Sequence, residues 1–375
     1  MFERGFTVLR VRGIPVRLHL SLLIFLPYVA FIATRQYRYL AGVLGVAPDQ
    51  LGLPPVVWGV LLAVGLFVAV LAHELAHSLV ALRNGARVRS ITLMMLGGVS
   101  LIEDELPPLK EAWMAFVGPL ASFGIAAVSY AAYRLVPLPV GVDVALVAFA
   151  FTNALLGVFN LLPAFPMDGG RIVRGLLAGR LGQQRATVVA AAMGQGMAVL
   201  FALYAVVTYN LLLLLIAWFV WAGASAEKQR VSVLQSLRGL VVTDFMSERL
   251  GDAWIDETVG EVLRRLAHAG LVGARVLERA PAEGAHVAGV VTADDLQGAA
   301  ERGGATAPVT VAMDQTPRAV HAGDDAAQAF GELSRADGHA VLVLDAQDHV
   351  IGLVTPADVR RAVALGRLRD RGHRG

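Results

Sequence analysis

The chain of 375 residues contains no cysteine. This absence excludes disulfide bonds, zinc sites built on thiolates and catalysis by a cysteine nucleophile. Charged residues are also scarce, at 17% of the chain, against roughly 25% in an average soluble domain. Hydrophobic residues make up 56%. This composition is typical of a protein with a large membrane part.

A strong excess of charge of one sign is missing as well. The formal net charge is only +2, and the basic residues stand mostly beside apolar runs, where they act as orientation signals. The charge pattern therefore predicts no direct contact with nucleic acid.

Long apolar runs fill the first part of the chain and stop near Glu227. A bilayer span needs about 20 largely apolar residues, and six candidates occur, at 18–33, 55–82, 112–133, 142–162, 188–207 and 210–226. From Lys228 onward the charge content is that of a soluble protein. We therefore predict a transmembrane domain at 1–227 and a linker at 228–240. No clear cleavage site follows the first run, which favours a retained helix over a signal peptide.

Basic residues mark one side of the predicted spans. They are Arg10, Arg12, Arg17, Arg83, Arg87, Arg89, Lys110, Arg171, Arg174, Arg180, Arg185, Lys228 and Arg230. The opposite side has only Arg35, Arg38 and Arg134. The positive-inside rule thus predicts a multi-pass protein of the cell membrane, with the N-terminus and the tail in the cytoplasm.

The segment VRSITLMMLGGVSLIEDELPP (88–108) lies between the second and third spans and is too short to cross the bilayer twice. Non-helical backbone at membrane depth is tolerated only against protein or a watery cavity. We expect a re-entrant strand around Gly97 and Gly98. A surface hairpin is the alternative.

The motif HELAH places His73, Glu74 and His77 inside an apolar span. Residues four apart share one face of a helix, so the two imidazoles can hold one metal ion beside a glutamate base, as in zinc hydrolases. Ionisable residues inside a membrane are costly and mark functional sites. The alternative is a neutral histidine pair bonded to a neighbouring helix, with a protonated glutamate.

A catalytic zinc site needs three protein ligands and one open position. Without cysteine, the candidates are His, Asp and Glu, and FNLLPAFPMDGGR (159–171) offers Asp168 after an apolar span. Pro163, Pro166 and the glycine pair would break the helix there and turn the carboxylate inward. Alternatively, Asp168 caps the helix that follows.

These two motifs together resemble the site-2 protease family of intramembrane zinc metalloproteases. The family pattern pairs an H-E-x-x-H helix with an N-x-x-P-x-x-x-x-D-G segment, matched here by His73, Glu74 and His77 and by Asn160, Pro163, Asp168 and Gly169. We expect Zn²⁺ on His73, His77 and Asp168, with Glu74 as general base. Asn160 is the candidate donor to the oxyanion. Alternatively, Asn160 only bonds the helix backbone kinked at Pro163.

The resemblance extends to two smaller segments. LGGVS (96–100) looks like the family's re-entrant β segment, which implies that Gly97 and Gly98 hold an unwound substrate strand. VGPLAS (117–122) resembles the family's small-residue segment. The implied substrate is a single-span membrane protein, such as an anti-sigma factor or a membrane-bound transcription regulator, whose cytoplasmic fragment is released.

The tail contains an internal repeat. HVAGVVTADDL (286–296) and HVIGLVTPADV (349–359) begin 63 residues apart, and each ends a β-α-β-β-α pattern, which predicts two paired copies. They resemble cystathionine-β-synthase (CBS) modules, at 241–300 and 309–368, with a basic tail at 369–375. The resemblance implies possible homodimers and binding of ATP, ADP or AMP by Thr292, Asp295, Thr355 and Asp358.

The sequence thus predicts a polytopic α-helical membrane protein with a re-entrant β segment, followed by a soluble α/β tandem CBS domain. A transporter or channel gated by the tail is the alternative, although no inverted repeat is detectable among the spans. An inactive relative would lack a ligand or the base, and none is missing.

Overall fold

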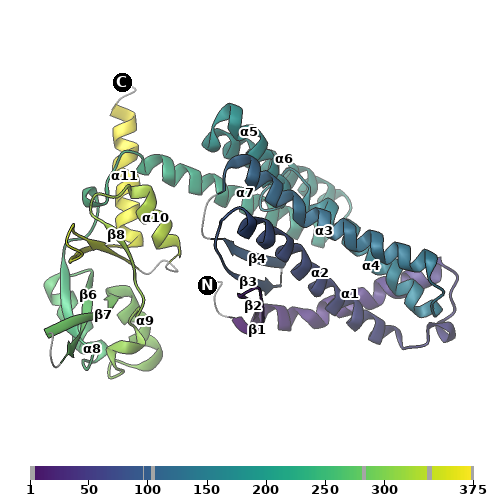
Figure 1. Cartoon of the computed structure of the whole chain (residues 1–375), viewed down its shortest axis with the longest axis horizontal. Helices are drawn as coiled ribbons and strands as arrows, with labels where there is room; N and C mark the ends of the chain where they lie inside the picture. Colours follow the sequence, from purple (N-terminus) through teal and green to yellow (C-terminus); the bar gives the residue numbers. More distant parts are fainter. Residues whose placement is uncertain (1–4, 96, 103–105, 281–283, 336–339, 373–375) are drawn as a thin grey trace. The chain divides into compact units, whose positions relative to one another are not determined.

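The computed structural model describes residues 5–95, 97–102, 106–280, 284–335 and 340–372. The chain divides into two compact units, Met1–Gln229 and Arg230–Gly375, with the elements labelled in Figure 1. The last three residues of the predicted basic tail lie outside the described residues.

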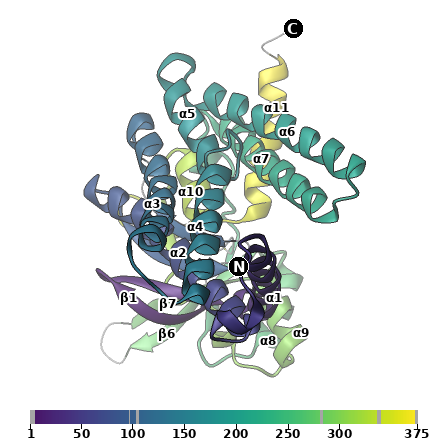
Figure 2. The same cartoon turned by 90° about the vertical axis from the view of Figure 1, so that its right-hand side faces the viewer.

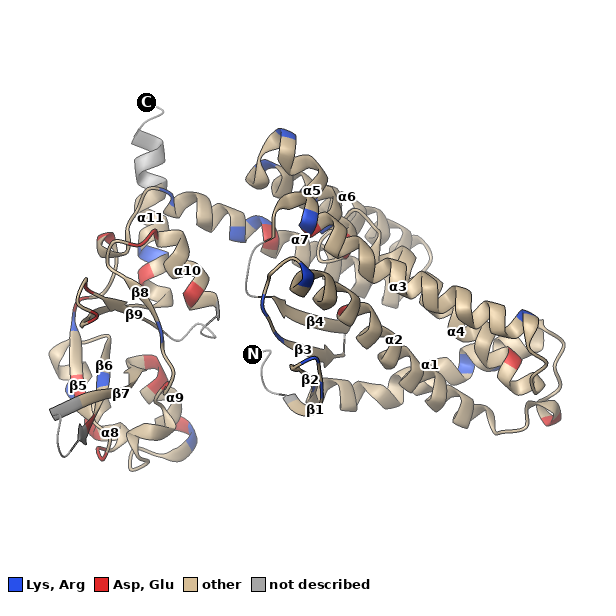
Figure 3. Ribbon diagram, in the orientation of Figure 1, with Lys and Arg blue, Asp and Glu red and all other residues tan. Residues whose placement is uncertain are grey.

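Among the described residues, six helices are long and apolar enough to cross a membrane, and the last of them ends in the second unit. They are α1 (Leu20–Val43), α2 (Pro55–Arg83), α3 (Pro108–Leu135), α4 (Val140–Asn160), α6 (Gln183–Val207) and α7 (Leu211–Leu237). Charged residues are sparse along these helices and gather near their ends (Figure 3). The predicted six spans are confirmed for the described residues, although α7 continues well past the predicted end at 226.

Small residues bring the last two spans together. Figures 1 and 2 show α6 and α7 side by side as a helical hairpin. Ala190 and Ala191 of α6 share one buried cluster with Ala224 of α7. Because lipid provides no hydrophobic drive between helices, such close packing of small side chains is what holds membrane helices together.

A four-stranded sheet in the first unit joins the N-terminus to the segment between α2 and α3. Its order is β1-β2-β3-β4, with β1 and β2 antiparallel, β2 and β3 parallel, and β3 and β4 antiparallel. The strands are β1 (Gly5–Val11), β2 (Ile14–His19), β3 (Val88–Met94) and β4 (Gly97–Ile102). Both β3 and β4 contact α2.

The sheet confirms one prediction and adds an element that we did not predict. Ile91 and Leu93 of β3 are buried, which argues against a surface hairpin. The N-terminal hairpin was missed because its strands run into the first apolar span. Its signal is the β-branched stretch around a turn at Arg12 and Gly13, both with positive φ (49° and 86°), as a two-residue hairpin turn requires.

The chain leaves α4 through a short irregular segment, 161–167, and enters α5 (Asp168–Leu181). A Cβ at Gly169 would lie 2.1 Å from the carbonyl oxygen of Leu162, and one at Gly170 would lie 2.7 Å from the backbone nitrogen of Phe165. The glycine pair therefore lets the first turn of α5 pack directly on the preceding segment. This packing fixes the position of Asp168.

A partly buried ion triad ties α5 to two other helices. The guanidinium of Arg174 binds the carboxylate of Glu111 in the first turn of α3 and that of Glu227 on α7, the latter at 2.5 Å. It also lies over the ring of Phe165, 5.3 Å from the centroid. Arginine suits this position because its planar fork can serve two carboxylates at once.

The second unit consists of two copies of the predicted β-α-β-β-α pattern. The first copy contains β5 (Leu250–Trp254), α8 (Val259–Ala269), β6 (Gly273–Ala280), β7 (Gly284–Thr292) and α9 (Ala293–Gly303). The second contains β8 (Arg318–His321), α10 (Ala326–Arg335), β9 (Val341–Leu344), β10 (Val350–Val354) and α11 (Pro356–Gly372). Each copy forms its own three-stranded sheet.

The two copies pair through exchanged segments. Ser247, which precedes the first copy, bridges to Leu353 of β10, and Asp314, which precedes the second, bridges to Val290 of β7. Val290 and Leu353 share a buried cluster with Leu342. The tail is therefore a CBS pair with a common core, as the repeat predicted.

Candidate metal centre

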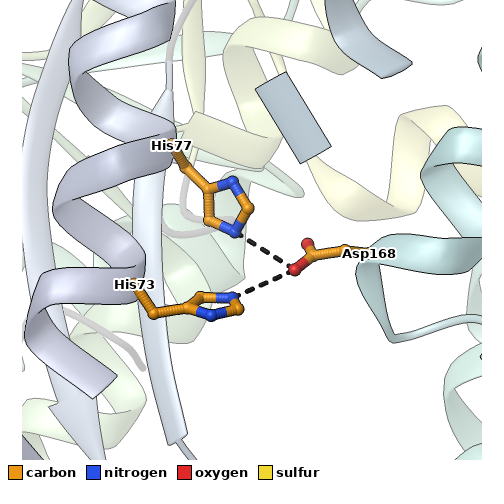
Figure 4. A group of neighbouring side chains, drawn as sticks. All are labelled: His73, His77 and Asp168. Atoms are coloured by element: carbon orange, nitrogen blue, oxygen red, sulfur yellow. Dashed lines mark hydrogen bonds and ion pairs between the residues drawn. The ribbon is translucent and has the colours of Figure 1, made fainter. Parts of the chain in front are cut away.

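Helix α2 places the two histidines of HELAH on one face. His73 and His77 are 4% and 6% exposed, and Asp168, at the start of α5, is 9% exposed. The Nε2 atoms of His73 and His77 lie 3.0 Å and 3.2 Å from the same oxygen, Oδ2 of Asp168 (Figure 4). Residues almost a hundred positions apart thus point at one spot inside the membrane unit.

This donor set fits a zinc ion. The three ligand atoms lie within 4.8 Å of one another. Tetrahedral zinc with N and O ligands at about 2.0–2.1 Å requires ligand atoms about 3.3–3.4 Å apart, close to the two separations observed. Two imidazoles and a carboxylate are also the ligand types that zinc prefers when cysteine is absent.

Helix α3 orients both imidazoles from behind. Nδ1 of His73 lies 2.9 Å from Oγ of the fully buried Ser122, and Nδ1 of His77 lies 2.7 Å from the carbonyl oxygen of Met114. A carbonyl only accepts, so Nδ1 of His77 carries the proton, and Nε2 keeps its lone pair for a metal. Such outer partners fix the tautomer and ring orientation of metal-binding histidines.

Removing one outer partner should weaken the metal site selectively. We expect Ser122→Ala to lower zinc affinity about tenfold, at the low end of the range for such partners. Competition against a zinc chelator of known affinity measures the effect. Ser129→Ala, which removes an α3 hydroxyl bonded only to the Ile125 carbonyl, should leave zinc affinity unchanged. Equal affinities for wild type and Ser122→Ala would contradict the role given to Ser122.

A glycine of α3 bounds the metal position. A Cβ at Gly118 would lie 2.3 Å from Nε2 of His77 and 2.7 Å from Nε2 of His73. Gly118 belongs to the VGPLAS segment, whose small residues the sequence pointed to without giving the reason. The reason is that any side chain here would enter the space between the two ligand nitrogens.

The two open alternatives for the ligands can now be compared with the structure. The cap of α5 is Met167, with no side-chain cap hydrogen bond, so Asp168 is the first residue of the helix and its carboxylate faces the histidines. The histidines do bond a neighbouring helix, but through Nδ1. Their Nε2 atoms converge on Asp168, which a simple packed pair would not require.

Glu74 lies against the last strand of the sheet. Oγ of Ser100 donates to Oε2 of Glu74 at 2.7 Å. A Cβ at Gly98 would lie 2.4 Å from Cγ of Glu74, whereas Gly97 has open space but a φ of 132°. Glycine is thus required at position 98 because the side chain of Glu74 packs there. At position 97 it is required because the backbone has a positive φ. The proposed role of both in substrate binding stays a prediction.

Asn160 occupies the last turn of α4. Its side-chain amide donates to the carbonyl of Leu156 at 3.0 Å. This bond agrees with the second reading of Asn160, a partner of the helix backbone, although the carbonyl belongs to Leu156 rather than to the kink at Pro163. Donation to an oxyanion stays a prediction.

The four predicted nucleotide ligands close capping boxes in the CBS pair. Thr292 and Asp295 cap α9, with Oγ1 and Oδ2 2.5 Å apart. Thr355 and Asp358 do the same at α11, where Oγ1 and Oδ2 lie 2.6 Å apart. Asp358 also accepts from Oγ of Ser247 at 2.8 Å and from Arg361. Their role at a ligand stays a prediction.

The family comparison agrees with the geometry. The model of peptidase family M50 matches residues 61–145 and 138–203, ranges that contain His73, His77 and Asp168. Over these residues the membrane unit is similar to peptidase family M50. A CBS domain model matches residues 309–365 of the tail. With six candidate spans among the described residues, this chain is a multi-pass membrane protein.

Two curated proteins similar to this chain are named as a zinc metalloprotease and a putative zinc metalloprotease. One, from Methanocaldococcus jannaschii, is 32% identical over 64% of this chain and 65% of its own length. The other, from Mycobacterium tuberculosis, is 35% identical over 66% of this chain and 65% of its own length. The chain thus spans just under two thirds of each relative.

Among solved structures, the site-2 protease from Methanocaldococcus jannaschii is 30% identical. The match covers 60% of this chain and 95% of that chain, with a TM-score of 0.44.

Proposed function

We propose that this chain is an intramembrane zinc metalloendopeptidase. The observation that carries the proposal is the convergence of His73, His77 and Asp168 on one buried point, next to Glu74, inside a bundle of apolar helices. A transporter would not need three ligand atoms at zinc-binding separations. A structural zinc site would not need a neighbouring carboxylate that stays outside the ligand set.

The roles follow from the chemistry of the side chains. His73, His77 and Asp168 would hold zinc, which acts as a Lewis acid on the scissile carbonyl and makes water acidic enough to attack near neutral pH. Glu74 accepts the proton of the attacking water and returns it to the leaving amine. Asn160 would donate to the oxyanion after releasing the carbonyl of Leu156.

The substrate is a peptide segment that has lost its helical hydrogen bonds. A helix buries its carbonyls, so a membrane-spanning substrate must unwind before cleavage. Strand β4 pairs with β3 on one side, and no strand among the described residues covers its other edge. This edge can take up the unwound segment by strand addition, close to Glu74.

The partner that best fits this chemistry is a single-span regulatory membrane protein, such as an anti-sigma factor or a membrane-bound transcription regulator. Cleavage would release its cytoplasmic fragment. The basic residues near the ends of the spans support an N-terminus and CBS pair in the cytoplasm. Since the chain has no cysteine, single cysteines introduced at either end can be labelled from one side of the membrane, and labelling from outside would contradict this orientation.

Regulation by ATP, ADP or AMP at the CBS pair, and dimerisation through it, are parts of the same proposal. They are supported by the family of the tail alone. Titration calorimetry with each nucleotide on the full chain tests the first, and light scattering in detergent tests the second.

Metal removal tests the enzymatic proposal. Purified protein in detergent should cut a model single-span substrate, lose activity with a zinc chelator and regain it with added zinc, because the three ligands form one site. Metal content, measured alongside, should be one zinc per chain. A protein that holds no metal and cuts nothing would sink the protease proposal and favour the transporter or channel.

A further inference from the structure

Strand β4 presents two residues to the proposed general base. Gly98 and Ser100 are two positions apart, so they lie on the same face of the strand. Gly98 leaves room for Cγ of Glu74, and Ser100 donates to Oε2 of Glu74 at 2.7 Å. The strand therefore contacts Glu74 at two positions. The side chain of Glu74 packs against the backbone of Gly98 and accepts a hydrogen bond from the hydroxyl of Ser100.

The hydroxyl of Ser100 belongs to a directed chain of hydrogen bonds. Oγ of the fully buried Ser78 donates to Oγ of Ser100 at 3.2 Å. Ser78 lies four residues after Glu74 and shares its face of α2. A serine hydroxyl has a single proton. Because Ser100 accepts from Ser78, its own proton points at Glu74, where the carboxylate Oε2 at 2.7 Å is a closer acceptor than the backbone oxygen at 3.4 Å.

This chain of hydrogen bonds ends on one carboxylate oxygen of Glu74. A carboxylate only accepts hydrogen bonds, and hydroxyl-to-carboxylate bonds of about 2.5–2.7 Å are among the strong ones. Only one oxygen of Glu74, Oε2, is taken by Ser100. The carboxylate is therefore held in one orientation while its other oxygen remains available for a proton.

We propose that Ser100 is a positioning residue for the proteolytic reaction: it fixes Glu74 to the strand that takes up the substrate. The inference rests on the proposed protease function and adds a link between its parts. Strand β4 orients Glu74 through Ser100, and its free edge can bind the substrate peptide. The base and the peptide are therefore both positioned by the same strand. Catalytic groups held by packed, hydrogen-bonded neighbours keep the geometry that the reaction needs.

Replacement of the hydroxyl should lower turnover and little else. For Ser100→Ala we expect kcat to fall about 10- to 100-fold, the range for losing a hydrogen bond to a charged group. The KM should stay within about twofold, because the base acts in the transition state rather than in binding. Ser100→Thr retains the hydroxyl and should restore most of kcat. Zinc content should equal that of wild type in both variants, since Ser100 bonds to Glu74 and Ser78 rather than to His73, His77 or Asp168.

The experiment measures kcat, KM, zinc content and thermal stability for wild type, Ser100→Ala, Ser100→Thr and the control Ser129→Ala. Ser129 supplies a membrane hydroxyl bonded only within its own helix, so its loss should leave kcat unchanged. A wild type that cuts, with Ser100→Ala equally fast, overturns the role of Ser100 alone. Loss of zinc or a rise in KM in Ser100→Ala overturns it too. A wild type that does not cut overturns the protease function, and this inference with it.

Discussion

Alanine at position 118 is expected to exclude zinc from the protein. The added Cβ would lie 2.3 Å from Nε2 of His77 and 2.7 Å from Nε2 of His73, in the space between two ligand atoms. Both imidazole rings are hydrogen-bonded to α3 through Nδ1. They therefore have little freedom to move away from the added Cβ. We expect Gly118→Ala to lower bound zinc about tenfold or more and cleavage with it, as measured by metal analysis of the purified variant.

The same helix supplies a matched control. Gly124 is also in α3, and a Cβ there would meet nothing within 4 Å. Both substitutions replace glycine by the better helix former, so neither should weaken the helix itself. Gly124→Ala should retain zinc and activity. Full zinc occupancy in Gly118→Ala would show that the ion does not sit between His73 and His77.

The second large effect concerns the base. Glu74→Gln should lower kcat about 10²- to 10⁴-fold, the usual contribution of a positioned general base, while zinc content stays unchanged. Glutamine keeps the size of the side chain and can still bond Ser100, but it cannot accept the proton of the attacking water. Single-turnover cleavage of the model substrate, with metal analysis of the same sample, measures both quantities.

A membrane carboxylate away from the metal serves as the control for this change. Asp143 lies in the first turn of α4, at the opposite end of that helix from Asn160. Asp143→Asn should leave kcat unchanged. A Glu74→Gln variant that cuts at the wild-type rate would exclude Glu74 as the base. One that loses zinc as well would show that Glu74 helps to hold the metal.

The convergence of His73, His77 and Asp168 could be predicted from the sequence because local structure constrains where these side chains point. His73 and His77 are one helical turn apart. Asp168 follows Pro166 and precedes two glycines, and these residues restrict the positions that its carboxylate can take. The six membrane spans could also be predicted from the sequence, since the length of an apolar run alone defines them. The fold of the tail could be predicted from its internal sequence repeat.

The residues behind the ligands could not be predicted in this way. The positions of α3 and β4 against α2 give Ser122, Gly118 and Ser100 their roles. The spacing of residues within one segment does not predict how segments pack against one another. The pairing of the N-terminal hairpin with the rest of the sheet is equally non-local. Strand β2 pairs with β3 across more than seventy residues, and nothing local marks that pairing.

The ion triad has a practical consequence for dividing the protein. The boundary between the two compact units falls at 229 and 230, inside the continuous helix α7. Glu227, which binds Arg174, stands just before it, while Leu237 at the end of the helix is buried in the core of the second CBS module. Truncation before Glu227 would remove one of the two carboxylates that Arg174 binds, and a partly buried guanidinium that loses a partner destabilises the fold. A chain shortened to its membrane part should therefore end beyond Glu227, even though the apolar sequence has already finished there.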